Sequence, residues 1–142
     1  MKTFILQQPL LFILSGLMAS ASAQAHHSTS GFNTEEVVAI EGTVTQFRWT
    51  NPHASIKIDV ADTGEAADIW TIELTAPNVL VNQGWKRTSL RNGDKVTVYG
   101  NPMNNPDFRL RDGSQGALYV GVTLADGSNL GRVDGKGEGS DQ

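Results

Sequence analysis

The stretch Ser55-Ile-Lys-Ile-Asp-Val60 carries an apolar side chain at every second residue, and the turn sequence Asp62-Thr-Gly64 follows it. Strict alternation is typical of a β-strand with one buried face, because successive side chains of a strand point to opposite sides. We therefore expect Ile56, Ile58 and Val60 to face a hydrophobic core.

The same period of two recurs on both sides of this stretch. It predicts further strands at residues 37–49, 69–75, 95–99 and 117–124, separated by turns rich in Gly, Asn and Asp. In the first of these strands the apolar parity changes, and Gly42 is the expected site of the β-bulge that changes it. The side chains expected to point inward are Val38, Ile40, Val44, Trp70, Ile72, Leu74, Val96, Val98, Leu118, Val120, Val122 and Leu124.

A short helix is predicted between the third and fourth strands. Pro77 suits a first helical turn, where its missing N–H costs nothing, and Gly84 suits the end of a helix. Three strands, a helix and two strands follow the order of an OB-like five-stranded Greek-key barrel. The expected fold class is thus all-β with one short helix, with a small β-sandwich as the alternative.

The N-terminal segment has the pattern of a secretory signal peptide. Lys2 precedes an apolar run at residues 10–18, and small residues follow up to Ala25. Cleavage after Ala25 makes His26 the first residue of the mature chain, and a rival cut lies before Gln24. The apolar run is too short to span a bilayer, so we expect a periplasmic or secreted protein with no membrane span after processing.

The domain organisation expected from this pattern is simple. Residues 1–25 form the signal peptide, residues 26–127 a single OB-like domain, and residues 128–142 a flexible Gly-rich tail with little to bury.

Composition excludes several classes of function. The chain has 11 Lys and Arg, 15 Asp and Glu, and a formal net charge of −4, with its basic residues scattered. A nucleic-acid partner is therefore not expected, because binding phosphates needs clustered cations. The absence of Cys excludes thiolate metal sites and thiol redox chemistry. No nucleophile motif or carboxylate pair stands out, so no catalytic residues are assigned and an enzyme is the less favoured class.

The three histidines are the most informative polar residues. They are His26 and His27 at the predicted mature start and His53 in the motif Trp49-Thr-Asn-Pro-His-Ala54. A free amine and the ring of His26 can chelate one metal ion, and His53 can add a third nitrogen. A nitrogen-rich site without thiolates favours Cu(II). This ligand set resembles the histidine brace of lytic polysaccharide monooxygenases and of some copper carriers.

Two other interpretations of the histidines stay open. His27 at the second mature position can bind copper together with the amine and the intervening amide nitrogen. Alternatively, His26 and His27 are solvated, and His53 only forms a hydrogen bond in its loop.

Aromatic and basic side chains offer a possible ligand face, because OB-type barrels bind ligands with stacking side chains. Trp49 and Asn51 beside the His53 loop are the first candidates, while Trp70 is expected in the core and Trp85 against the helix. Arg109 and Arg111, in a predicted loop at residues 100–115, are candidates to meet an anionic ligand. The remaining aromatic candidates are Tyr99 and Phe108.

Several motifs together carry a resemblance to an exported bacterial family of unknown function. They are Ala25-His-His-Ser28, Gly42-Thr-Val44, Trp49-Thr-Asn-Pro-His-Ala54, Ala76-Pro-Asn78, Gly84-Trp85, Leu90-Arg-Asn-Gly-Asp94 and Val96-Thr-Val98. The resemblance covers roughly residues 25 to 125 and implies export and a small β-rich domain. It brings no assigned activity or ligand, and the chain departs from the family pattern only in turns.

Three hypotheses of function follow. The first is an exported copper-binding protein, acting as carrier, chaperone or sensor, with His26, His27 and His53 as ligands. The second is a metal-free OB-type module that binds a small molecule, a glycan or a protein. The third, a copper-dependent oxidative enzyme, ranks last because no substrate platform is evident.

Overall fold

The strands form in the segments where the side chains alternate. The computed structural model describes residues 29–133. Within this range the elements are η1 (Thr29–Gly31), β1 (Val38–Arg48), β2 (Ser55–Asp59), η2 (Ala66–Asp68), β3 (Ile69–Glu73), α1 (Pro77–Asn82), β4 (Lys95–Pro102), β5 (Gln115–Thr123) and β6 (Asn129–Gly131).

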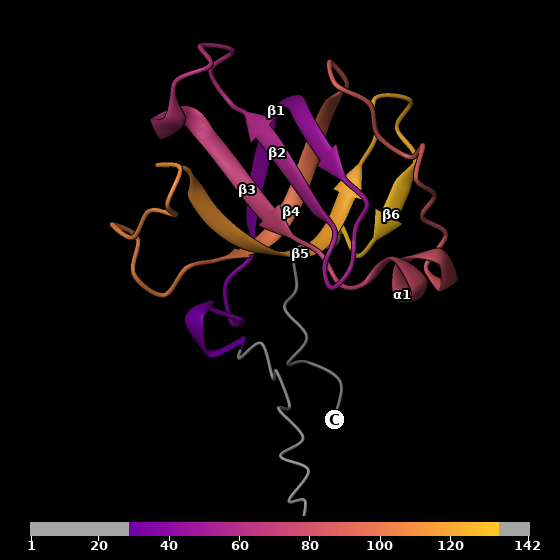
Figure 1. The fold of residues 1–142 in the computed structure, drawn as a ribbon, viewed down its shortest axis with the longest axis horizontal. Helices are drawn as coiled ribbons and strands as arrows, with labels where there is room; N and C mark the ends of the chain where they lie inside the picture. Colours follow the sequence, from indigo (N-terminus) through magenta and orange to yellow (C-terminus); the bar gives the residue numbers. More distant parts are fainter. Residues whose placement is uncertain (1–28, 134–142) are drawn as a thin grey trace, which may run out of the picture.

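Five of these strands close into a barrel, seen with β2 and β3 in front in Figure 1. The order in the sheet is β3-β2-β1-β4-β5-β6, and a parallel pairing between β3 and β5 closes the circle. β3 pairs with the first half of β5, and β6 pairs with its second half. This is the connectivity of an OB-type barrel, so the predicted fold class is confirmed and the sandwich alternative is not adopted.

The core is formed by the inward side chains of all five barrel strands. Ile56, Ile58, Ile72, Val98 and Val122 are completely buried, as the alternation predicts. α1 and the segment after it add Leu80, Trp85 and Leu90 to the same cluster.

The predicted bulge in the first strand lies three residues further along than expected. The register of β1 against β2 shifts between Val44 and Gln46, not at Gly42. β1 pairs with β4 through Thr43 and then continues along β2, so the irregularity falls where the strand changes partner. Gly42 has another role, because a Cβ there would lie 2.5 Å from the carbonyl oxygen of Asp59.

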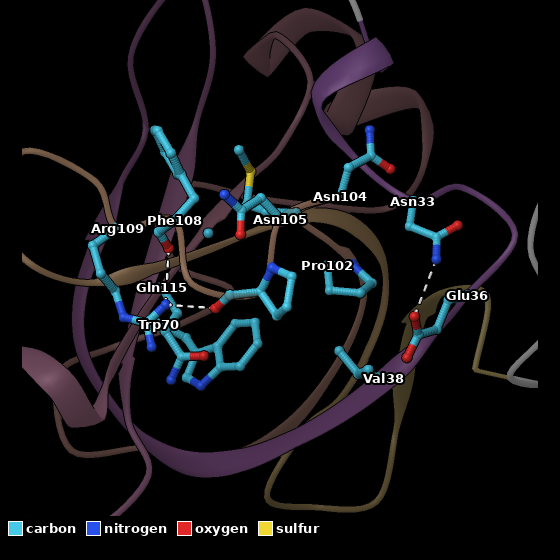
Figure 2. A pocket seen from close by; sticks show the side chains of 13 residues that line it. Asn33, Glu36, Val38, Trp70, Pro102, Asn104, Asn105, Phe108, Arg109 and Gln115 are labelled. Carbon is cyan, nitrogen blue, oxygen red and sulfur yellow. Dashed lines mark hydrogen bonds between the residues drawn. The ribbon is translucent and has the colours of Figure 1, made fainter.

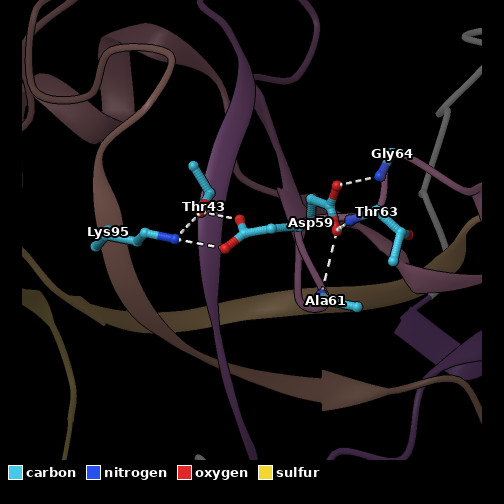
Figure 3. Close-up of polar contacts among 7 residues, drawn as sticks. Thr43, Asp59, Ala61, Thr63, Gly64 and Lys95 are labelled. Atoms are coloured by element: carbon cyan, nitrogen blue, oxygen red, sulfur yellow. Dashed lines mark hydrogen bonds and ion pairs between the residues drawn. The ribbon is translucent and has the colours of Figure 1, made fainter.

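Val60 does not face the core, contrary to the prediction, and is 41% exposed. β2 ends at Asp59, whose buried carboxylate accepts hydrogen bonds from the backbone N–H groups of Ala61, Thr63 and Gly64 (Figure 3). These bonds turn the chain away from the sheet directly after Asp59. Val60 therefore leaves the strand before its alternation would bury it.

The prediction of which residues point inward is also wrong in the first half of the fifth strand. Tyr99 pairs with Gly121 and Gly100 with Tyr119, which leaves Val120 as the extra residue of a bulge. Ala117 and Tyr119 contact the core before the bulge, and Val122 and Leu124 contact it afterwards. Leu118 and Val120 are absent from the core cluster for this reason.

The connections differ in length from their predictions. α1 begins at Pro77 as expected, and Gly84 has the positive φ of 87° that suits a helix end. β4 continues to Pro102, which shortens the following loop to residues 103–114. The sheet also continues beyond residue 127 through β6, inside the range expected to be a tail. Residues 1–28 and 134–142 lie outside the described residues.

Candidate functional site

His53 lies next to a carboxylate. Its Nδ1 is 2.5 Å from Oε1 of Glu73, and the two side chains are 29% and 37% exposed. The contact arises from the register of the sheet, since Ser55 at the start of β2 is paired with Glu73 at the end of β3. Backbone bonds between Ala54 and both Leu74 and Thr75 continue this pairing and hold the loop in place.

The Glu73 contact favours one tautomer of His53. An ionised carboxylate can only accept a hydrogen bond, so Nδ1 donates and the lone pair of a neutral ring lies on Nε2. This arrangement, in which a carboxylate orients an imidazole from behind, recurs around histidines that bind metals through the other nitrogen.

The two residues expected beside His53 are in different situations. The ring of Trp49 packs edge-on against Phe47, with centroids 5.7 Å apart, and its backbone carbonyl accepts a bond from Arg87. Asn51 is exposed in the loop between β1 and β2. The Trp49 ring therefore contributes to packing, whereas Asn51 is exposed to solvent in the same loop as His53.

An aromatic row continues inward from Trp49. Phe47 contacts Trp85, and Trp85 contacts Tyr119 with centroids 5.5 Å apart. Trp85 Nε1 donates to the Tyr119 hydroxyl, which in turn donates to the carbonyl of Leu130 in β6. Burial of the Tyr119 phenol raises its pKa to about 12. Tyr119 therefore stays protonated and serves as a structural donor that ties β6 to the barrel.

The predicted ligands His26 and His27 lie outside the described residues. The segment that follows them is held at the end of β4, because Asn33 N–H donates to the Pro102 carbonyl and Asn104 donates to Ser30 and Gly31. Within residues 29–133, no group of three His, Asp or Glu side chains is arranged to hold a metal ion.

A pocket of about 200 Å³ opens at the other end of β3, where β1 and β5 begin and β4 ends (Figure 2). Its apolar lining includes Trp70, Phe108, Met103 and Pro102, and its polar lining includes Arg109. Trp70 shares the parity of Ile72 and packs against the core, but it is only partly buried and lines the pocket.

Sequence reasoning did not identify the Glu73 contact or the pocket. The strand pattern assigns no role to Glu73 and predicts Trp70 in the core. Trp70 does pack against the core, but it also lines the pocket. The available signal for Glu73 was the antiparallel pairing of the second and third strands, which places the residues around 54 and 74 side by side. The pocket depends on the path of the loop after β4, for which the sequence carries no periodic signal.

The described residues thus define a small OB-type barrel with a carboxylate-oriented histidine at one end and a pocket at the other. The chain belongs to a family of unknown function, DUF6152, whose profile matches residues 15–115. No curated protein matches the chain. No helix within the described range is long and apolar enough to cross a membrane.

One solved structure with a similar chain path is a mitochondrial single-stranded DNA binding protein from S. cerevisiae, Rim1. It is 18% identical with a TM-score of 0.43, and the match covers 66% of this chain and 94% of that chain.

Proposed function

We propose that this protein is exported and binds copper, as a carrier, chaperone or sensor, with His53 as one ligand and His26 at a processed N-terminus as another. The observation that carries the proposal is the 2.5 Å contact between His53 Nδ1 and Glu73. It presents the lone pair of Nε2 and fixes the ring, which is what a metal-binding imidazole needs.

The remaining ligands come from the sequence. The free amine and ring of His26 supply two nitrogens, and His27 supplies an alternative pair with its preceding amide. A site of nitrogens without thiolate favours Cu(II) over the other divalent metals of the first transition row.

The test is a calorimetric titration of Cu(II) into protein that begins at His26. We expect binding of one ion, a weaker site in His53→Ala, and a smaller loss in Glu73→Gln, since the amide still contacts the ring but no longer favours one tautomer. Glu65→Gln is the matched control, because this exposed residue lies on another loop. Equal copper affinity in the His53→Ala and unchanged chains would contradict the proposal.

The pocket beside Trp70 favours a second function, a module that binds a small molecule. This function needs no metal, and the two sites lie at opposite ends of β3. The same chain can hold both.

A further inference from the structure

The pocket beside Trp70 combines an aromatic floor with a fixed cation. Trp70 and Phe108 line it from β3 and from the loop after β4, and Phe108 is 45% exposed. Met103 lies over Gly116, where a Cβ would meet its side chain at 3.3 Å, so the missing side chain keeps this wall open. These surfaces suit a flat apolar group more than a flexible chain.

Arg109 is held in place by the loop that carries it. Its Nη1 donates to the backbone carbonyls of Pro106, at 2.7 Å, and Phe108, at 2.9 Å. Among the described residues no carboxylate forms an ion pair with Arg109. A guanidinium has five N–H donors in a fixed fork, so its Nε and Nη2 edge is available for bidentate binding of a carboxylate.

The far side of the pocket has the opposite character. Figure 2 shows Glu36 and Asn33 across the pocket from Arg109, with Trp70 and Pro102 between them. Glu36 Oε2 accepts a bond from Asn33 Nδ2 at 3.1 Å. This end repels a second anion and accepts hydrogen bonds from a neutral donor.

The volume of the pocket suits one aromatic ring. A closed apolar cavity of about 150 Å³ is enough to bind benzene. The 200 Å³ of this pocket, which is partly open to solvent, therefore matches one aromatic ring with small polar substituents.

We propose that this pocket binds a single-ring aromatic carboxylate with a hydroxyl group opposite its carboxyl group. The carboxylate pairs with Arg109, the ring lies between Trp70 and Phe108, and the hydroxyl donates to Glu36. The interaction is noncovalent and does not involve the His53 end of the barrel.

The probes are 4-hydroxybenzoate, 4-hydroxybenzyl alcohol and terephthalate, titrated by calorimetry into the chain freed of metal with a chelator. 4-Hydroxybenzoate should bind at submillimolar concentration. The alcohol lacks the carboxylate and should bind at least about tenfold more weakly, because a charge-assisted hydrogen bond is lost. Terephthalate should bind as poorly, because its second carboxylate meets Glu36. These comparisons use the unchanged chain and do not depend on the folding of a variant.

Two substitutions assign the contacts. Arg109→Gln should weaken binding of 4-hydroxybenzoate by about tenfold or more, and Phe108→Ala should weaken it severalfold. Arg111→Gln is the matched control, an exposed arginine on the same loop outside the pocket lining, and should leave binding unchanged. Absence of 4-hydroxybenzoate binding at millimolar concentration, equal binding of all three probes, or equal losses at Arg109 and Arg111 would each overturn the proposal. Because metal is removed throughout, the result is independent of the copper proposal.

Discussion

Replacement of Asp59 by Asn tests how the turn after β2 is held. Asp59 is 5% exposed, and its carboxylate accepts hydrogen bonds from three backbone N–H groups, those of Ala61 at 3.2 Å, Thr63 at 3.3 Å and Gly64 at 2.6 Å. Asn has the same shape, so its carbonyl can keep the two bonds made by Oδ1. Its amide nitrogen, however, would face the N–H of Gly64 as a second donor.

The magnitude follows from these bonds. The shortest of the three is lost and the other two change from charge-assisted to neutral, so the free energy of unfolding should fall by about 1.5–3 kcal/mol. The assay is equilibrium unfolding in urea followed by tryptophan fluorescence, where the midpoint should decrease with an unchanged slope.

The matched control is Asp126→Asn. Asp126 also accepts bonds within a turn, from Ser128 N and Oγ, but it is exposed. This control should change the free energy of unfolding by less than about 0.5 kcal/mol, as is usual for surface substitutions. A loss in Asp59→Asn no larger than that of the control would refute the reasoning.

Two further predictions concern packing and charge. Gly42→Ala should destabilise the fold by about 1–3 kcal/mol, because its Cβ would meet the Asp59 carbonyl oxygen of the neighbouring strand; a melting temperature equal to that of the unchanged chain would contradict this. Hydrogen bonds from Lys57 and Ser114 hold the pKa of Asp112 well below its ordinary value of 3.8, so the folded state binds fewer protons than the unfolded chain. The stabilisation that the lowered pKa of Asp112 provides is fully present above about pH 3.8. It is lost as the pH falls from there through the lower pKa of the folded state. Asp112→Asn should therefore lower stability at neutral pH and reduce its decline in acid; parallel pH profiles of the two chains would be evidence against this.

The order of the strands was predictable because alternation is a local signal. Each strand of the barrel carries its own period of two, and Pro77 and Gly84 mark the helix without reference to distant residues. The residues that stay buried in both the prediction and the structure, such as Ile58 and Ile72, lie in the middle of strands.

Two of the errors lie where a strand changes its partner. The bulges at Thr45 and Val120 arise from the registers of β1 against β2 and of β4 against β5, which no single segment encodes. Val60 follows the alternation of β2, but the carboxylate of Asp59 ends the strand first. A local pattern of alternation cannot show that a side chain will accept hydrogen bonds from the backbone that follows it.

Of the two residues that form the His53 site, only His53 could be predicted from the sequence, for a similar reason. His53 stood out by its residue type and by the motif around it, whereas Glu73 is one of many carboxylates until β2 and β3 are aligned. Arg109 was recognised as a possible contact for an anion. Its partners in the pocket, above all Trp70, became evident only from the loop that brings them together.

The central claim is a copper site that joins a processed N-terminus to His53. Its most direct test is the electron paramagnetic resonance spectrum of Cu(II) bound to the exported protein, compared with the same chain carrying a methionine before His26. The account predicts one bound ion with coupling to several nitrogens, and a different spectrum with weaker binding after the extension, because the amine chelate is destroyed. Identical spectra and affinities in the two forms, or no copper bound by the exported protein, would contradict it.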